Sequence, residues 1–117
     1  MLAIRGATTI NKDSQESVQK AVEELIREIW SSNKIDKSEI ISITFSTTAD
    51  IKSYYPAKAF RDLGYDKVPL FSTMEPEIEG SLNYTIRVLI YLERPNSRDV
   101  QHVYLNESAN LRPDLID

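Results

Sequence analysis

One stretch decides the fold, and it reads Tyr84-Thr85-Ile86-Arg87-Val88-Leu89-Ile90-Tyr91-Leu92-Glu93. Aliphatic side chains occupy every second position from Ile86 to Leu92, and Leu89 and Tyr91 accompany Arg87 at the positions between them. Because successive side chains of a strand point to opposite faces of a sheet, this pattern predicts a strand with apolar residues on both faces. One face therefore combines an arginine with apolar neighbours that should be covered.

Two arginines, Arg5 and Arg87, are predicted to lie inside strands. Alternation alone favours a solvent-facing side chain for both. For Arg87 the apolar neighbours argue against this, and a covered arginine needs an anionic partner because an unpaired buried charge is very costly. The partner could be a carboxylate of the protein or a bound ligand.

The rest of the pattern predicts about five strands in all, one long helix and one short helix. The long helix is expected to start with Asp13 as its cap and Glu16 three residues later, and to end at residues 31–33. The short helix is expected to start at Pro56 and to be closed by Gly64. The apolar stripe of the long helix consists of Val18, Val22, Leu25, Ile26 and Ile29. The other predicted strands are Leu2–Thr9, Ile41–Ser46, Lys67–Phe71 and Gln101–Leu105, and the tail 106–117 is expected to be irregular.

One long helix can cover only one face of such a sheet. The second apolar face of the strand around Arg87 must then be buried by something else, and another copy of the chain is the economical solution. We therefore expect an α+β fold in a single domain spanning residues 1–117, with a mixed sheet packed with helices on one face. We also expect a homo-oligomer that buries the other face of the sheet.

Composition excludes several kinds of site. The chain has 117 residues, a net charge of −4, one histidine and no cysteine. Disulfides, a thiolate nucleophile and a paired-imidazole metal site are therefore excluded, and the isolated glycines form no phosphate loop. His102 is interpreted as a structural hydrogen-bonding group or an exposed strand residue, and Trp30 as packing. The net negative charge argues against binding to nucleic acid. No apolar run is long enough for a membrane span, and the N-terminus does not have the pattern of a signal peptide. We therefore expect a cytoplasmic protein.

Several segments, in order along nearly the whole chain, carry a more specific signal. They are Ile4-Arg5-Gly6-Ala7-Thr8-Thr9, Tyr55-Pro56-Ala57-Lys58-Ala59-Phe60-Arg61, Val68-Pro69 followed by Met74-Glu75, Ile86-Arg87-Val88, His102-Val103-Tyr104-Leu105 and Leu111-Arg112-Pro113-Asp114-Leu115. Together they resemble the monofunctional AroH-type chorismate mutases. Each segment alone is weak, but in register they are a strong signal.

The resemblance implies an isomerase that rearranges chorismate to prephenate in phenylalanine and tyrosine biosynthesis, without a metal or other cofactor. It also implies a homotrimeric pseudo-α/β barrel, an architecture similar to that of the YjgF-type proteins, with active sites between subunits. The resemblance also implies which residues form each active site. One subunit supplies Arg5, Ser72, Glu75, Arg87, Tyr104 and Leu111, and its neighbour supplies Tyr55, Lys58 and Arg61.

The implied roles follow from an intramolecular reaction in which the ether oxygen becomes negative and the ring positive. The expected catalytic residues are Arg87, which donates to the ether oxygen, Glu75, which accepts from the ring hydroxyl, and Arg5, which binds a carboxylate. The expected substrate-binding residues are Tyr104 beside Arg5, Arg61 and Lys58 on the second carboxylate, Ser72 as a hydrogen-bonding group, and Tyr55 and Leu111 as apolar walls.

Some positions depart from the family pattern or have simpler interpretations. Ser72 stands where cysteine is common, and Pro76 directly after Glu75 is expected to alter the loop that carries this carboxylate. Lys58 fits an exposed helix cation equally well, and Tyr104 fits a strand aromatic. Two alternatives come from other classes: a YjgF-type imine deaminase and a small-metabolite sensor on the same architecture.

Overall fold

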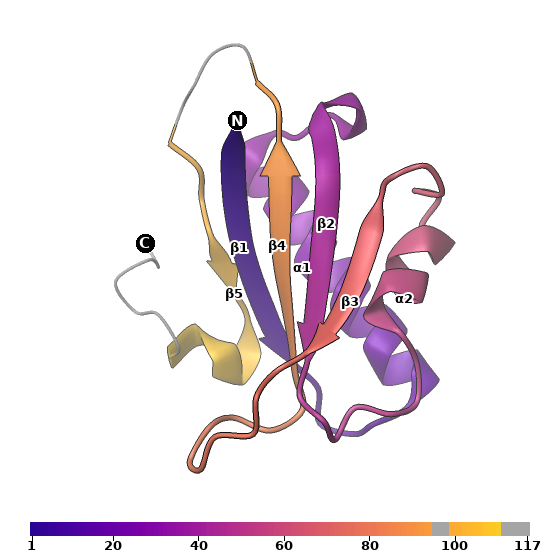
Figure 1. The fold of residues 1–117 in the computed structure, drawn as a ribbon, viewed down its shortest axis with the longest axis vertical. Helices are drawn as coiled ribbons and strands as arrows, with labels where there is room; N and C mark the ends of the chain where they lie inside the picture. Colours follow the sequence, from indigo (N-terminus) through magenta and orange to yellow (C-terminus); the bar gives the residue numbers. More distant parts are fainter. Residues whose placement is uncertain (95–98, 111–117) are drawn as a thin grey trace.

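The protein folds into a five-stranded mixed sheet with both α-helices on one face (Figure 1). A computed structural model describes residues 1–94 and 99–110. The strand order is β3-β2-β4-β1-β5, with β4 antiparallel to both of its neighbours and the two edge strands parallel to theirs. The strands are β1 (Leu2–Thr9), β2 (Ile40–Thr47), β3 (Leu70–Met74), β4 (Thr85–Leu92) and β5 (Val103–Tyr104). The predicted α+β class and mixed sheet are confirmed.

The helices lie behind the sheet in Figure 1 and form the core with its rear face. They are α1 (Gln15–Asn33) and α2 (Pro56–Asp62). Two short 3-10 helices complete the fold: η1 (Lys37–Glu39) precedes β2, and η2 (Asn106–Asn110) follows β5. All five residues of the predicted apolar stripe are buried on α1, opposite the aliphatic residues of β4. Gly64 adopts a positive φ and its N–H donates to Arg61, which confirms the predicted end of the short helix.

The predicted cap of the long helix is wrong by one residue. Ser14 caps α1, because its side chain accepts from the Ser17 N–H. The Asp13 carboxylate instead accepts hydrogen bonds from the backbone of Lys52 and Ser53 and from the Ser53 hydroxyl, which holds the pKa of Asp13 below its ordinary value. Asp13 therefore ties the start of α1 to the segment that precedes α2.

One predicted strand is shifted along the chain, and another is longer than the strand observed. The strand expected over 67–71 is β3 at Leu70–Met74, because it forms its parallel ladder with β2 only from Leu70 onwards. The strand expected over 101–105 contains only Val103 and Tyr104, since the backbone N–H and C=O of Gln101 bind the side-chain amide of Asn33. The tail expected to be irregular begins with η2, and residues 111–117 lie outside the described part.

Ile41 is exposed, although in the sequence it alternates with Ile43 and Phe45 as if all three shared the buried face of one strand. A register shift between Ile40 and Ser42 in the β2–β4 ladder turns Ile41 out of the alternation. Ile43 and Phe45 follow the shift and are buried as expected. The open face of β2 is consequently polar from Ser42 onwards.

The two faces of β4 differ as the sequence pattern indicates. Its even-numbered residues are buried under α1, whereas Arg87, Leu89 and Tyr91 are half-buried on the opposite face. Neither helix covers that face (Figure 1). Among the described residues, the apolar part of this face is thus left uncovered by the helices.

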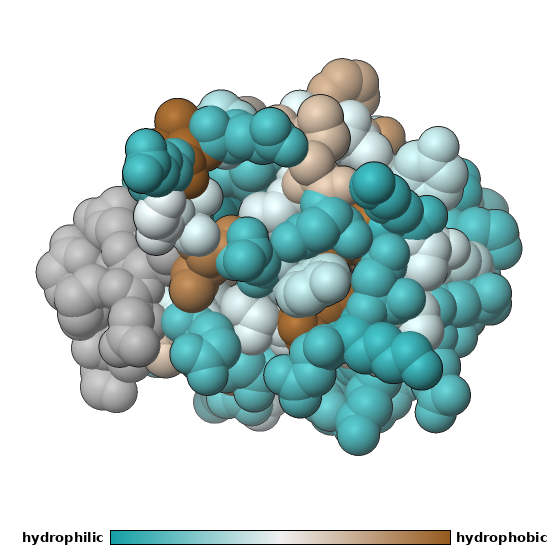
Figure 2. All heavy atoms as spheres, turned by 90° about the horizontal axis from the view of Figure 1, so that it is seen from below, coloured by the Kyte–Doolittle hydropathy of each residue, from teal (hydrophilic) through white to brown (hydrophobic). Residues whose placement is uncertain are grey.

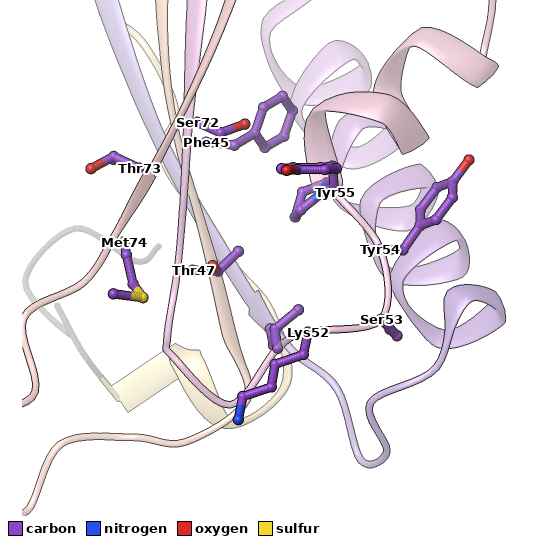
Figure 3. A pocket seen from close by; sticks show the side chains of 11 residues that line it. Phe45, Thr47, Lys52, Ser53, Tyr54, Tyr55, Ser72, Thr73 and Met74 are labelled. Carbon is purple, nitrogen blue, oxygen red and sulfur yellow. The ribbon is translucent and has the colours of Figure 1, made fainter.

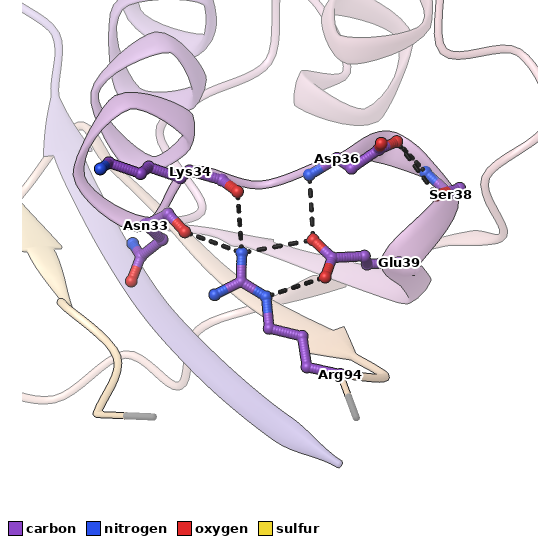
Figure 4. A network of polar contacts seen from close by, with 6 residues as sticks. All are labelled: Asn33, Lys34, Asp36, Ser38, Glu39 and Arg94. Atoms are coloured by element: carbon purple, nitrogen blue, oxygen red, sulfur yellow. Dashed lines mark hydrogen bonds and ion pairs between the residues drawn. The ribbon is translucent and has the colours of Figure 1, made fainter. Parts of the chain in front are cut away.

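Just after the C-terminal end of β4, Arg94 connects this strand with the end of α1 and with η1 (Figure 4). Its guanidinium donates to the carbonyl oxygens of Asn33 and Lys34 at the end of α1, and it pairs with Glu39 at 3.1 Å. The Asp36 N–H and the Arg94 guanidinium hold the pKa of Glu39 below its ordinary value. These contacts satisfy free carbonyls of the helix end and connect it to the sheet.

Trp30 belongs to an aromatic cluster under α2, which confirms its interpretation as a packing residue. Its ring meets Phe60 and Tyr65 edge to face, and its indole N–H donates to the Tyr65 hydroxyl at 2.8 Å. The cluster holds α2 against α1.

Gly6 marks the closest approach between α1 and the sheet. A Cβ at this position would lie 2.8 Å from Ile29 Cδ1 and 2.9 Å from Val88 Cγ1. We expect Gly6→Ala to lower the free energy of unfolding by about 1–3 kcal/mol through overpacking. Urea denaturation measures the change, and Ile29→Val, which removes the Cδ1 atom, should recover part of the loss in the double variant. Equal stability of Gly6→Ala and the parent protein would contradict this packing.

Candidate active site

A cavity of about 230 Å³ opens on the uncovered face of the sheet, where β2, β4, β1 and β5 lie side by side. It contains four of the residues predicted for the site: Arg5, Glu75, Arg87 and Tyr104. Gly6, Thr44, Ser46, Val88 and Leu89 complete its lining. The strand register brings Arg5, Arg87 and Tyr104 together, since Ala7 pairs with Arg87 on one side and with Tyr104 on the other, two residues after Arg5. Glu75 directly follows the end of β3.

Arg87 and Glu75 form an ion pair in this cavity, with 3.3 Å between Arg87 Nε and Glu75 Oε1. The Nε atom is buried, although 43% of the Arg87 side chain is exposed, and it has no hydrogen-bond partner among the described residues. The contact is thus an ion pair that leaves a buried donor free. Pro76 does not remove Glu75 from the site, because the Glu75 N–H donates to Thr47 at 2.8 Å and keeps the end of β3 on β2.

Arg5 lies in the middle of β1 with its side chain exposed on the open face. Its backbone N–H donates to His102 Nδ1 at 2.9 Å, which confirms a structural hydrogen bond for the histidine. This bond and the β1–β5 ladder hold Tyr104 close to Arg5. An arginine and a phenol beside each other suit the oxygens of a carboxylate.

A second, larger pocket of about 540 Å³ lies at the other edge of the sheet, between β2, β3 and the segment that leads into α2 (Figure 3). Tyr55 and Ser72 both line it, together with Phe45 beside Ser72 and Met74 at the end of β3. Ser72 lies opposite Phe45 in the ladder, so it points to the helix side of the sheet. The structure therefore places Ser72 with Tyr55 and on the opposite side of the sheet from Arg87, unlike the predicted grouping.

The predicted cations Lys58 and Arg61 are both on α2. Lys58 donates to the Tyr54 hydroxyl at 3.1 Å and lies 3.8 Å from Asp62; these two groups, the hydroxyl first, raise the pKa of Lys58. Arg61 is exposed in the last turn. Because α2 is on the helix side of the sheet, neither cation reaches the Arg87 cavity of the same chain. Leu111 and Arg112 lie outside the described residues.

Ser46 belongs to the Arg87 cavity and was not predicted for the site. Its hydroxyl donates to Glu75 Oε2. The alternation of β2 indicates that Ser46 lies on a polar face, but no sequence signal connects it with Glu75, which is far along the chain. Only the parallel pairing of β2 with β3 brings the two residues together.

Chemically, the cavity presents two arginines, a carboxylate and a phenol to an anionic ligand. Within the described residues, no group of histidine, aspartate and glutamate side chains is arranged to hold a metal ion. The end of the molecule seen in Figure 2 is mainly hydrophilic with small apolar patches, and neither described helix has the length and apolar character of a membrane span. These features define a class of protein: a small α+β protein with an arginine-lined anion site on a partly apolar sheet face.

Comparison with known proteins narrows the class. The profile of the family described as chorismate mutase type I matches residues 1–115. The chain is 40% identical over 114 residues to the chorismate mutase AroH of Thermus thermophilus, covering 96% of this chain and 93% of the relative. It is 34% identical to AroH of Bacillus subtilis, covering 96% and 90%. A solved structure of a chorismate mutase from Clostridium thermocellum matches with a TM-score of 0.88 and 33% identity, over 92% of this chain and 97% of that one.

The chain therefore belongs to the type I chorismate mutase family. It is an isomerase of aromatic amino acid biosynthesis, as the resemblance of its segments implied. The imine deaminase and the metabolite sensor considered as alternatives have no support from these matches.

Proposed function

We propose that the chain rearranges chorismate to prephenate in clefts between the subunits of a cytoplasmic homotrimer, with Arg87 as the principal catalytic residue. One observation carries the proposal: the buried, unbonded Nε of Arg87 in a cavity that also contains Glu75 and Arg5. A buried donor without a partner is costly, and a ligand oxygen would satisfy it.

The reaction breaks the ether C–O bond and forms a new C–C bond between the enolpyruvyl arm and the ring of the same molecule, so it needs no proton transfer or covalent intermediate. Protein can therefore contribute confinement of the substrate and fixed charge where charge develops. Arg87 would donate to the ether oxygen, which becomes negative in the transition state. Glu75 would accept from the ring hydroxyl and lie near the ring, which becomes positive. Arg5 and Tyr104 would bind one carboxylate.

The second half of each site would come from a neighbouring subunit. Tyr55, Lys58 and Arg61 lie on the helix side of their own sheet, so a cleft that combines them with Arg87 requires two chains. Ser72 shares the pocket of Tyr55 and is assigned to this half. Arg61 and Lys58 would bind the second carboxylate, which would draw Lys58 from Asp62. Tyr55 of this half would exclude water together with Leu111 of the subunit that supplies Arg87.

The open face of the sheet supports an assembly of this kind. Leu89 and Tyr91 are only half-buried there, and β3 adds Phe71, which is 68% exposed. Apolar side chains exposed on a sheet face are commonly covered by another copy of the chain. A homotrimer with the sheets packed inward and the helices outside would bury them, as in a pseudo-α/β barrel.

The absorbance of chorismate provides the test. Purified protein should remove this absorbance and form prephenate at a rate proportional to its concentration, with no added metal or cofactor. Light scattering on the same sample should give the mass of a trimer. A folded trimer that leaves chorismate to react at the rate in buffer would contradict the proposal.

A further inference from the structure

Ser46 occupies a central position among the charged groups of the Arg87 cavity. In the β2–β4 ladder it lies directly opposite Arg87, and in the β2–β3 ladder it lies beside Thr73, the second residue before Glu75. Paired residues of neighbouring strands project from the same face, so the Ser46 hydroxyl and the Arg87 side chain enter the cavity together.

Each oxygen of the Glu75 carboxylate has a different neighbour. Oε2 accepts the hydrogen bond from Ser46, and Oε1 faces Arg87 Nε at 3.3 Å. The Glu75 N–H is anchored on Thr47, so the start of its side chain is fixed as well. In the described part of the chain, no hydrogen bond joins Glu75 to Arg87, although the two side chains form an ion pair.

The contact between Arg87 and Glu75 is weaker than the best geometry that an arginine and a carboxylate can adopt. The pair is strongest when both oxygens accept parallel N–H bonds from the guanidinium fork. A glutamate side chain has enough rotational freedom to turn both oxygens towards an adjacent arginine. Such a bidentate pair would use the donors of Arg87 that an anionic substrate needs.

We propose that Ser46 is a positioning residue that keeps Glu75 from pairing with Arg87 through both oxygens. By holding Oε2, the hydroxyl limits Glu75 to a single loose contact and leaves the guanidinium available to substrate. The inference rests on the proposed roles of Arg87 and Glu75 in the mutase reaction. Ser46 acts through Glu75 and needs no contact with substrate.

Replacing Ser46 by alanine tests this inference, and the small change in volume should preserve the strand. Without the hydroxyl, Glu75 closes on Arg87 in most free molecules, and substrate must displace it. The KM for chorismate should then rise about tenfold, comparable to the loss of one hydrogen bond to a charged group, while kcat stays within about threefold. A purely structural role would instead lower the active fraction and kcat and leave KM unchanged.

Three further variants complete the experiment. Ser46→Thr keeps the hydroxyl on a β-branched residue and should restore the KM. Ser42→Ala removes a hydroxyl from the same face of β2 outside the cavity and should have no effect. In a Glu75→Ala background, adding Ser46→Ala should change KM less than about twofold, because the carboxylate to be held is gone.

The outcomes separate this inference from the function on which it depends. A wild-type KM for Ser46→Ala, or an equal rise in KM with and without Glu75, would overturn the role of Ser46. If Glu75→Ala itself keeps the wild-type rate, the proposed role of Glu75 in the reaction fails instead.

Discussion

Replacing Arg87 by lysine is expected to lower kcat for chorismate about 10²–10³-fold, the usual effect of removing one fixed donor to a developing negative charge. Lysine keeps the positive charge but loses the planar fork. A lysine ammonium is a single point of attachment, and it can form a compact salt bridge with Glu75. The Nε that lies buried beside Glu75 has no counterpart in lysine.

Rates of chorismate loss for the purified variant measure this effect, with light scattering and circular dichroism to verify assembly and fold. Arg27→Lys is the matched control, since Arg27 is exposed on α1 and forms a surface pair with Glu23. That control should retain the wild-type kcat. A near-wild-type kcat for Arg87→Lys would remove the electrostatic role assigned to Arg87.

The second large effect is expected when two inactive variants are combined. Arg87→Ala removes the catalytic arginine from one half of a site, and Arg61→Ala removes a carboxylate-binding arginine from the other half. If each site takes its two halves from neighbouring subunits, a mixed trimer can contain a site in which both arginines are present. Random assembly of equal amounts makes both present in about a quarter of the sites, the product of two probabilities of one half.

The elements with strong periodicity were predictable from the sequence. β1 has the predicted limits, and α1 and β4 differ from prediction by one or two residues at their ends. Each has enough apolar positions to specify its own buried face. β3 could not be placed in this way, since its limits depend on the parallel ladder with β2 and its own residues are mostly exposed.

Errors at the ends of elements have a common physical cause. Asp13 and Ser14 can both cap a helix, and the contact of Asp13 with Ser53, forty residues away, decides which one does. In the same way, the bond between Asn33 and Gln101 limits β5 to two residues. Distant contacts of this kind leave no pattern in the local sequence.

In the candidate site, too, some features were predictable from the sequence and others depend on contacts between distant segments. Arg87 could be singled out because a charged residue shares a strand face with Leu89 and Tyr91. Its place in one site with Glu75 was implied by the family resemblance, and the structure brings the two side chains together. The side of the sheet on which Ser72 lies depends on its register with Phe45, and the bond from Ser46 to Glu75 depends on the order of the strands. Neither the orientation of Ser72 nor the bond between Ser46 and Glu75 could be predicted from the sequence alone.

The assembly of the site from two subunits is tested most directly by chorismate mutase activity in mixed trimers. Arg87→Ala and Arg61→Ala proteins would be unfolded together in equal amounts, refolded, and assayed beside each variant refolded alone. The expected result is about a quarter of the wild-type activity in the mixture, against very low activity in either variant alone. Activity in the mixture no higher than the mean of the two variants would show that each site lies within one chain, and would contradict the proposed cleft between subunits.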